Sequence, residues 1–349
     1  MTNLRRIDIH HHYFEPNKGA SGNKVGWLTP PENIPWTPAI SLRYMDASGI
    51  DVAILSFPAL STGSVSRENR HMARQRNVAM AEVCSAHPGR FGFFATLPFL
   101  NDIDGEFPSY LWWLCSLCGL GVLLEMAFAL DELKADGISM SSCYGEGAEA
   151  LYIGDERYDP IWRELDKRRA VVFIHGAQTP SSTPLPHSLL GIPTTEVPAE
   201  TFKAAAHLVV TGRKRKYPGP RIILAHFGGS TPFLAARVAG MAAYMGCTLR
   251  RVRIAFRASH RQWSSSPDEI LHDFSTFYFD SALSAHSTTL ALMSSWVGPE
   301  RVLFGTDFPA VSKETAGWYT KNVEDFYGED DLKNIMSQNA LNLFPKLAK

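Results

Sequence analysis

Short apolar runs recur along the chain, and each is followed by turn residues and a segment of helical character. Near-continuous apolar strands that alternate with helices are typical of a parallel sheet buried on both faces. The runs are Arg6–His12, Val52–Pro58, Phe91–Pro98, Gly137–Ser142, Ala170–Gly176, Arg221–Gly228, Phe277–Leu283 and Arg301–Pro309. Eight such units in 349 residues predict an α/β fold, a closed (β/α)8 TIM barrel in a single domain, residues 1–349. The alternative is an open doubly wound sheet, but no Gly-x-Gly-x-x-Gly turn follows the first run.

Polar side chains interrupt this pattern where four of the predicted strands end. They are His10 and His12 on the first strand, His175 on the fifth, His226 on the sixth and Asp307 on the eighth. Alternate residues of a strand share a face, so His10 and His12 point the same way and His11 points away. The carboxyl ends of the strands of a barrel meet at one cavity. The sequence therefore predicts that these residues meet there, although almost 300 positions separate the first from the last.

Imidazoles and a carboxylate gathered in one cavity suit a divalent ion such as Zn²⁺. Taken singly, a histidine after an apolar strand is usually structural, and the aspartate of GTDFP could form a turn. The coincidence of such residues at one end of four strands favours a metal site over these structural interpretations. We expect His11 to be structural, and Asp8 to hold a metal ligand through a hydrogen bond.

Charge and cysteine usage narrow the class of protein. Lys plus Arg number 34 and Asp plus Glu number 35, which gives no support for a nucleic-acid or membrane-surface partner. The basic run Arg213–Lys216 could be a nuclear signal, but a solvated loop before a strand is favoured. No signal peptide is visible, and an odd count of five cysteines favours a reducing, cytoplasmic setting. The Cys115-x-x-Cys118 pair lies in an apolar run without a second pair, so zinc or redox chemistry is not expected there.

Several short segments of the sequence resemble those of proteins in the amidohydrolase superfamily. DIHHHYFEP, FFATLP, ILAHFGGSTPFLAAR and LFGTDFP are similar to the branch that holds aminocarboxymuconate-semialdehyde decarboxylase and the γ-resorcylate, 5-carboxyvanillate and 6-methylsalicylate decarboxylases. The similarity runs from about residue 5 to residue 345. WLTPP and FYFDSALSA look most like the 6-methylsalicylate decarboxylase group.

The resemblance implies one bound metal ion, with zinc expected and manganese as the alternative. The implied ligands are His10, His12, His175 and Asp307. The fourth run, GISMSS, has no lysine to carbamylate, so a bridged two-metal centre is not expected.

The resemblance also implies roles for residues beside the metal. His226 would be a general acid/base. Arg237 matches a family arginine that can meet a substrate carboxylate, although a surface salt bridge is an equal alternative. His187, on the loop after the fifth strand, could touch substrate or simply lie on the surface.

The implied reaction is non-oxidative decarboxylation of a hydroxylated aromatic acid. The acid would bind the metal through its carboxylate and ortho-oxygen, and a proton from His226 or Asp307 would reach the ring carbon before CO₂ leaves. One alternative is a hydrolase on the same barrel, such as a lactonase, and another is a scaffold protein without activity. A homodimer is expected by resemblance alone.

One region departs from the family pattern. Residues 107–124 carry no charge, and Glu125–Lys134 already supplies the helix expected between the third and fourth strands. Residues from about 106 to 122 therefore form an atypical apolar insert. A retained intron would explain it, and a genuine flap, dimer contact or membrane-facing patch is the alternative. A transmembrane helix inside a closed barrel is not expected.

Overall fold

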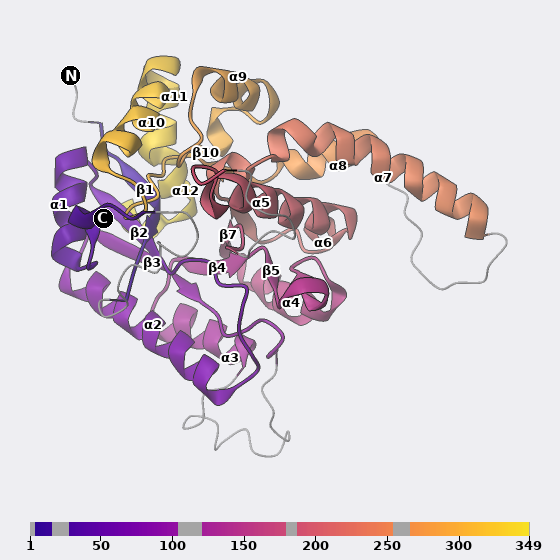
Figure 1. Ribbon diagram of the computed structural model, residues 1–349, viewed down its shortest axis with the longest axis horizontal. Helices are drawn as coiled ribbons and strands as arrows, with labels where there is room; N and C mark the ends of the chain where they lie inside the picture. Colours follow the sequence, from indigo (N-terminus) through magenta and orange to yellow (C-terminus); the bar gives the residue numbers. More distant parts are fainter. Residues whose placement is uncertain (1–3, 16–27, 104–120, 179–186, 254–265, 349) are drawn as a thin grey trace.

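A computed structural model describes residues 4–15, 28–103, 121–178, 187–253 and 266–348 (Figure 1). Its main sheet is parallel and has eight strands in the order β1-β2-β3-β4-β7-β8-β9-β10. The strands are β1 Ile7–His12, β2 Val52–Ser56, β3 Phe91–Thr96, β4 Gly137–Ser141, β7 Val171–His175, β8 Arg221–Leu224, β9 Tyr278–Asp280 and β10 Val302–Leu303. Each predicted strand contains one of these eight, and a short antiparallel pair, β5 Cys143–Tyr144 and β6 Leu151–Tyr152, was not predicted.

The sheet closes on itself through the segment that follows β10. The amide of Ile9 donates to the carbonyl of Phe304 at 3.0 Å, and the amide of Asp307 donates to the carbonyl of His10 at 2.8 Å. His11 and Phe308 form a parallel bridge. The predicted (β/α)8 barrel is therefore confirmed, with the chain after β10 completing the ring beside β1.

Helices surround the barrel, and Figure 1 shows α7 extending well beyond the rest of the molecule. They are α1 Pro38–Ser48, α2 Arg67–Ala86, α3 Val122–Ala127, α4 Asp159–Arg168, α5 Ile192–Val210, α6 Arg213–Lys216, α7 Thr231–Arg253, α8 Pro267–Ser275, α9 Ser287–Trp296, α10 Lys313–Phe326, α11 Glu329–Lys333 and α12 Asn339–Leu343. Side-chain oxygens satisfy the free amides that begin several of them. Ser66 accepts from the amide of Asn69 at the start of α2, and Ser266 and Glu269 form a capping box at the start of α8.

Aromatic side chains fill the barrel below the predicted site. The ring of Phe173 lies 5.0 Å from that of His10 and stacks on Phe94 at 5.3 Å. Phe94 in turn contacts the ring of Phe344, 5.7 Å away at the end of α12. This apolar column packs against the lower side of the histidines, and the cavity that the described residues form reaches them from the carboxyl ends of the strands.

The basic run does not form the solvated loop that the sequence predicted. Residues 213–216 make the helical turn α6, and both Arg213 and Lys216 form ion pairs with Asp159. Arg215 pairs with Asp273 at 2.8 Å. These acidic partners come from α4 and α8, which a local reading of the basic run could not identify.

Most of the apolar insert, including Cys115 and Cys118, lies outside the described residues. The helix after it begins at Val122, earlier than predicted, and continues through a π-helical turn, Phe128–Glu132. In the described part of the chain, no helix is long and apolar enough to cross a membrane.

Candidate metal centre

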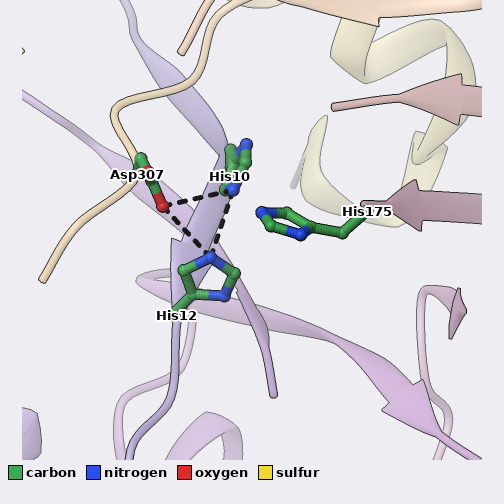
Figure 2. Close-up of side chains that lie close together, drawn as sticks. All are labelled: His10, His12, His175 and Asp307. Atoms are coloured by element: carbon green, nitrogen blue, oxygen red, sulfur yellow. Dashed lines mark hydrogen bonds and ion pairs between the residues drawn. The ribbon is translucent and has the colours of Figure 1, made fainter. Parts of the chain in front are cut away.

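The predicted ligands meet at the carboxyl end of the barrel. His10, His12, His175 and Asp307 are all buried, and one nitrogen or oxygen atom from each lies within 4.8 Å of the corresponding atoms of the others. Figure 2 shows their side chains pointing toward a common centre, His10 and His12 from β1, His175 from β7 and Asp307 from the segment after β10. The strand-end pattern therefore predicted correctly which side chains come together.

The distances between these atoms are short. Nε2 of His10 lies 3.2 Å from Nε2 of His12, and the same separation joins Nε2 of His226 and Nε2 of His175. Oδ1 of Asp307 lies 3.3 Å from Nε2 of His10 and 3.1 Å from Nε2 of His12. A tetrahedral zinc site, with bonds of about 2.0–2.1 Å, places neighbouring ligand atoms about 3.4 Å apart.

The outer nitrogens of the four imidazoles determine where their protons lie. Nδ1 is hydrogen-bonded to Asp280 in His10 (3.0 Å), to the carbonyl of Ser56 in His12 (3.2 Å), to the carbonyl of Gly176 in His175 (2.9 Å) and to the carbonyl of Ala282 in His226 (2.9 Å). A carbonyl or carboxylate oxygen can only accept, so Nδ1 donates in His10, His175 and His226, while Nδ1 of His12 also has the hydroxyl of Ser56 at 3.1 Å. In the neutral rings, Nε2 then carries a lone pair, and these lone pairs face one another.

Facing lone pairs and a carboxylate fit a cation. Oδ1 of Asp307 is buried and accepts no hydrogen bond from any described residue. A buried oxygen of this kind is costly unless something positive compensates it. Three imidazole nitrogens and one carboxylate oxygen are also the donor set that Zn²⁺ and similar divalent ions prefer. The residues present therefore fit a divalent metal ion.

The ionisation of the cluster follows from its burial and its neighbours. Burial lowers the pKa of His10, but Asp280 and Asp307 outweigh it and raise that pKa to about 10. Burial and the adjacent imidazoles hold the pKa of His175 well below 6.5, and burial followed by His10 lowers the pKa of His226. Burial opposes ionisation of Asp307, yet the neighbouring imidazoles, His10 above all, keep its pKa well below the usual range.

Two residues of the site adopt left-handed backbone conformations. His226 has a φ of 57° and Asp307 a φ of 63°, and both follow their strands by a few residues rather than ending them. Such conformations are costly for residues other than glycine and persist where the surrounding structure enforces them. Gly305 permits the close approach here, because a Cβ on it would lie 2.8 Å from Cβ of His10.

Asp280 is a site residue that the strand-end analysis missed. One of its carboxylate oxygens pairs with Nδ1 of His10, while the other accepts from the amides of His226 (3.2 Å) and Ala282 (2.9 Å). The signal was present, since Asp280 is the last residue of β9 in the word FYFDSAL. Asp280 orients both a predicted ligand and the segment that carries His226.

Asp8 holds a predicted ligand through a hydrogen bond, and it does so at the backbone of His10 rather than at its ring. Its carboxylate accepts from the amide of His10 at 3.1 Å, from the amide and hydroxyl of Thr306 at 3.0 and 2.6 Å, and contacts Nδ1 of His11. Within the described structure it therefore contacts the backbone of His10, and Asp280 contacts the ring. Asp8 connects β1 to the segment that presents Asp307.

A cavity of about 840 Å³ opens above the cluster. His12, His175, His226 and Asp307 reach its wall. Most of the remaining wall is apolar, with Phe14, Ile34, Pro35, Trp36, Phe57, Leu60, Val197, Leu283 and Val311 among the lining residues. An apolar cavity with a few convergent polar groups suits a small organic molecule.

Neither predicted substrate-binding residue lines this cavity. Arg237 is exposed on α7, and His187 is exposed and accepts a hydrogen bond from the amide of Leu189 at Nδ1. Both lie outside the set of residues that form the cavity wall in this single chain. Both residues follow the predicted strands as expected from the sequence. The sequence could not show whether their side chains enter the cavity.

Comparison with known proteins agrees with this geometry. The amidohydrolase family profile matches residues 7–346. The chain is 34% identical to the 6-methylsalicylic acid decarboxylase of Aspergillus aculeatus, over 99% of this chain and 97% of that protein. It is 32% identical to the 6-methylsalicylic acid decarboxylase of Penicillium expansum, with the same coverage of both chains.

A solved structure shares the fold. The dihydroxybenzoic acid decarboxylase of Polaromonas sp. JS666, with bound manganese and the inhibitor 2-nitroresorcinol, superposes with a TM-score of 0.76 at 25% identity. The alignment covers 99% of this chain and 98% of that one. By its sequence over nearly its whole length, as well as by its fold, this chain belongs to the amidohydrolase family.

Proposed function

We propose that the protein is a metal-dependent, non-oxidative decarboxylase of a hydroxylated aromatic carboxylic acid of the 6-methylsalicylate or γ-resorcylate type. The observation that carries this proposal is the buried histidine and aspartate cluster, which opens into an apolar cavity. Support comes from relatives of more than 30% identity that are named as decarboxylases of such an acid.

His10, His12, His175 and Asp307 would hold one divalent ion. Zinc suits this donor set, and manganese, which the Polaromonas structure contains, is the alternative. When bound, the ion supplies positive charge that offsets the anionic substrate and fixes its orientation.

The cavity wall would hold the aromatic ring. Trp36, Phe57 and Leu283 are among its apolar members, and the acid group would lie toward the histidines. In this orientation the carboxylate-bearing carbon would face Nε2 of His226, and the apolar wall would exclude bulk water from the ring.

His226 is the best candidate for proton transfer. Its Nδ1 proton is held by the carbonyl of Ala282, so Nε2 is the atom that can exchange a proton with substrate. Burial lowers its pKa, so the resting ring is neutral and can take the phenolic proton of the substrate. The resulting imidazolium then protonates the ring carbon, the bond to the carboxylate breaks, and its electron pair restores the aromatic ring as CO₂ leaves. One further proton from solvent completes the phenol.

Asp307 is the weaker candidate for this transfer. Its low pKa keeps the carboxylate ionised, so it has no proton to give near neutral pH. Its predicted catalytic role is therefore confined to electrostatic support, and its role as a ligand is the one that the geometry favours.

We also propose a homodimer in a cytoplasmic setting. Support for a second copy comes from α7, where Phe233 is 81% exposed and Met241 is 50% exposed. Exposed apolar side chains along a projecting helix are typical of an interaction surface.

The proposed function is tested by loading purified protein with Zn²⁺ or Mn²⁺ and measuring CO₂ release from a panel of salicylates. A panel of lactones beside it separates decarboxylation from hydrolysis on the same barrel. Metal-dependent CO₂ release without lactone hydrolysis supports the proposal. Lactone hydrolysis without CO₂ release from any salicylate would overturn it.

A further inference from the structure

A buried arginine in the cavity wall has no place in the chemistry described so far. Arg76 lies on α2 and is 7% exposed, and it lines the cavity together with His12. Among the described residues that form this wall, it is the single arginine or lysine. Its ion-pair partner Glu15 lines the same wall, and the apolar side chains around the pair leave little water to screen the charge of an entering group.

Two contacts fix the orientation of its guanidinium group. Nε donates to Oε1 of Glu15 at 3.0 Å, and Cζ lies 3.8 Å from the centre of the Phe57 ring. Within the described chain, this bond to Glu15 is the hydrogen bond that the guanidinium makes, so the two terminal amino groups keep their donors. A planar fork of two amino groups matches the geometry of a carboxylate.

Through Phe57, this fork is connected to the segment that orients a predicted metal ligand. Phe57 follows Ser56, the last residue of β2, and the carbonyl of Ser56 is hydrogen-bonded to Nδ1 of His12. The ring that supports Arg76 is therefore one residue away from the group that orients a ligand. Both Phe57 and His12 reach the same cavity.

Arg74 shows that the same contacts can serve structure alone. Its Nε donates to Glu125 at 2.6 Å, and its Cζ lies 3.6 Å from the centre of the Phe128 ring. The two arginines thus share a glutamate and a phenylalanine partner and lie two residues apart on α2. They differ in place, because Arg74 lies outside the set of residues that line the cavity.

We propose that Arg76 binds the carboxylate of the aromatic acid through its terminal amino groups, with Glu15 and Phe57 holding the guanidinium in position. The proposal rests on the proposed function and identifies a determinant of its substrate class. Arg76 fills the role that the sequence analysis assigned to Arg237. It selects an acid over the corresponding phenol, which has the same ring without the carboxylate.

The test compares metal-loaded wild type with Arg76→Met, Arg76→Lys and the matched control Arg74→Met. KM is measured for 6-methylsalicylate, and the inhibition constant is measured for 3-methylphenol, which lacks the carboxylate. Arg76→Met should raise KM about 10- to 100-fold while changing the inhibition constant less than about twofold. Arg76→Lys should lose most of the affinity as well, because an ammonium lacks the fork. Arg74→Met should leave both constants unchanged.

Three outcomes would overturn the proposal: an unchanged KM in Arg76→Met, equal weakening of acid and phenol, or the same acid-specific loss in Arg74→Met. If Arg76→Met shows no cooperative melting transition, Arg76→Lys decides by the same criteria. If wild type releases no CO₂ from any salicylate, the proposed function fails separately. Calorimetric binding of benzoate and phenol to the metal-loaded proteins then decides the role of Arg76.

Discussion

The two faces of β1 carry the same residue type and do different things. His10 and His12 point into the barrel, where their Nε2 atoms approach each other and Asp307. His11 points outward, where Nδ1 contacts Asp8 at 3.0 Å and Nε2 contacts Ser41 at 2.6 Å. Both ring nitrogens of His11 are thus satisfied within the protein, whereas those of its neighbours are satisfied on one side only.

The comparison teaches that burial does not identify a functional histidine. His10 and His11 are both fully buried. The two residues differ at Nε2. In His11 this atom contacts the hydroxyl of Ser41, whereas in His10 it faces Nε2 of His12 and the carboxylate of Asp307. That arrangement is unfavourable in the absence of a proton or a cation, and the site is built to take one of them.

Removing an inner histidine should have the largest effect. His12→Ala deletes a predicted ligand, so we expect bound metal to fall to near zero and kcat to fall by about 10³ or more. Elemental analysis and CO₂ release measure the two effects on the same sample. Full metal content in this variant would mean that His12 is not a ligand.

His226→Ala tests the fourth inward-facing imidazole. It should retain bound metal but lose about 10²–10⁴ in kcat, because the proton donor is removed and the four ligands stay. Metal content and kcat are measured side by side. Turnover at the wild-type rate would exclude His226 from the mechanism.

Asp280→Asn tests whether the hydrogen bond to Nδ1 of His10 supports metal binding. It keeps the shape of the side chain but removes the carboxylate that holds Nδ1 of His10, so metal affinity should fall about 10- to 100-fold. Competition with a chelator of known affinity provides the measurement. An unchanged dissociation constant would show that the ring of His10 needs no such partner.

The ionisation of His10 should make metal binding depend on pH. With its pKa raised to about 10, His10 holds a proton at neutral pH when no metal is present, and metal must displace it. The apparent affinity for Mn²⁺ should therefore rise with pH, by up to about tenfold per unit between pH 6 and 9. Calorimetry in buffers of different ionisation enthalpy counts the protons released. Binding with no proton release at neutral pH would contradict this ionisation of the cluster.

His11→Phe should have the smallest effect on chemistry. It retains stacking on Phe308, whose ring lies 4.5 Å away, but removes both hydrogen bonds. The free energy of unfolding should fall by about 1–3 kcal/mol, while metal content and KM remain unchanged. Denaturant unfolding and elemental analysis of the variant test this prediction. Loss of metal from a folded variant would show that His11 also supports metal binding.

The sequence predicted the barrel and the membership of the cluster for the same physical reason. Parallel strands of one sheet share their carboxyl ends, so polar residues placed there converge whatever their separation along the chain. The alternation of side chains along a strand also separated His11 from its neighbours correctly. Asp280, at the end of β9, follows the same rule, although it was not among the residues predicted for the site.

Other features depend on tertiary contacts that no local pattern reports. Arg76 is one of many polar residues on a long helix, and its place in the cavity depends on Glu15 and Phe57 from other segments. Arg237 follows His226 at a suggestive spacing, but its side chain is exposed on α7 and does not line the cavity of its own chain. The basic run became a helical turn because α4 and α8 supply carboxylates.

The most direct measurement is the metal content of the purified protein after loading with Zn²⁺ or Mn²⁺ and exhaustive dialysis. We expect one divalent ion per chain in wild type and in His11→Phe, and almost none when His10 and His12 are both replaced by alanine. Wild type without bound metal, or equal metal in the double variant, would contradict the central claim.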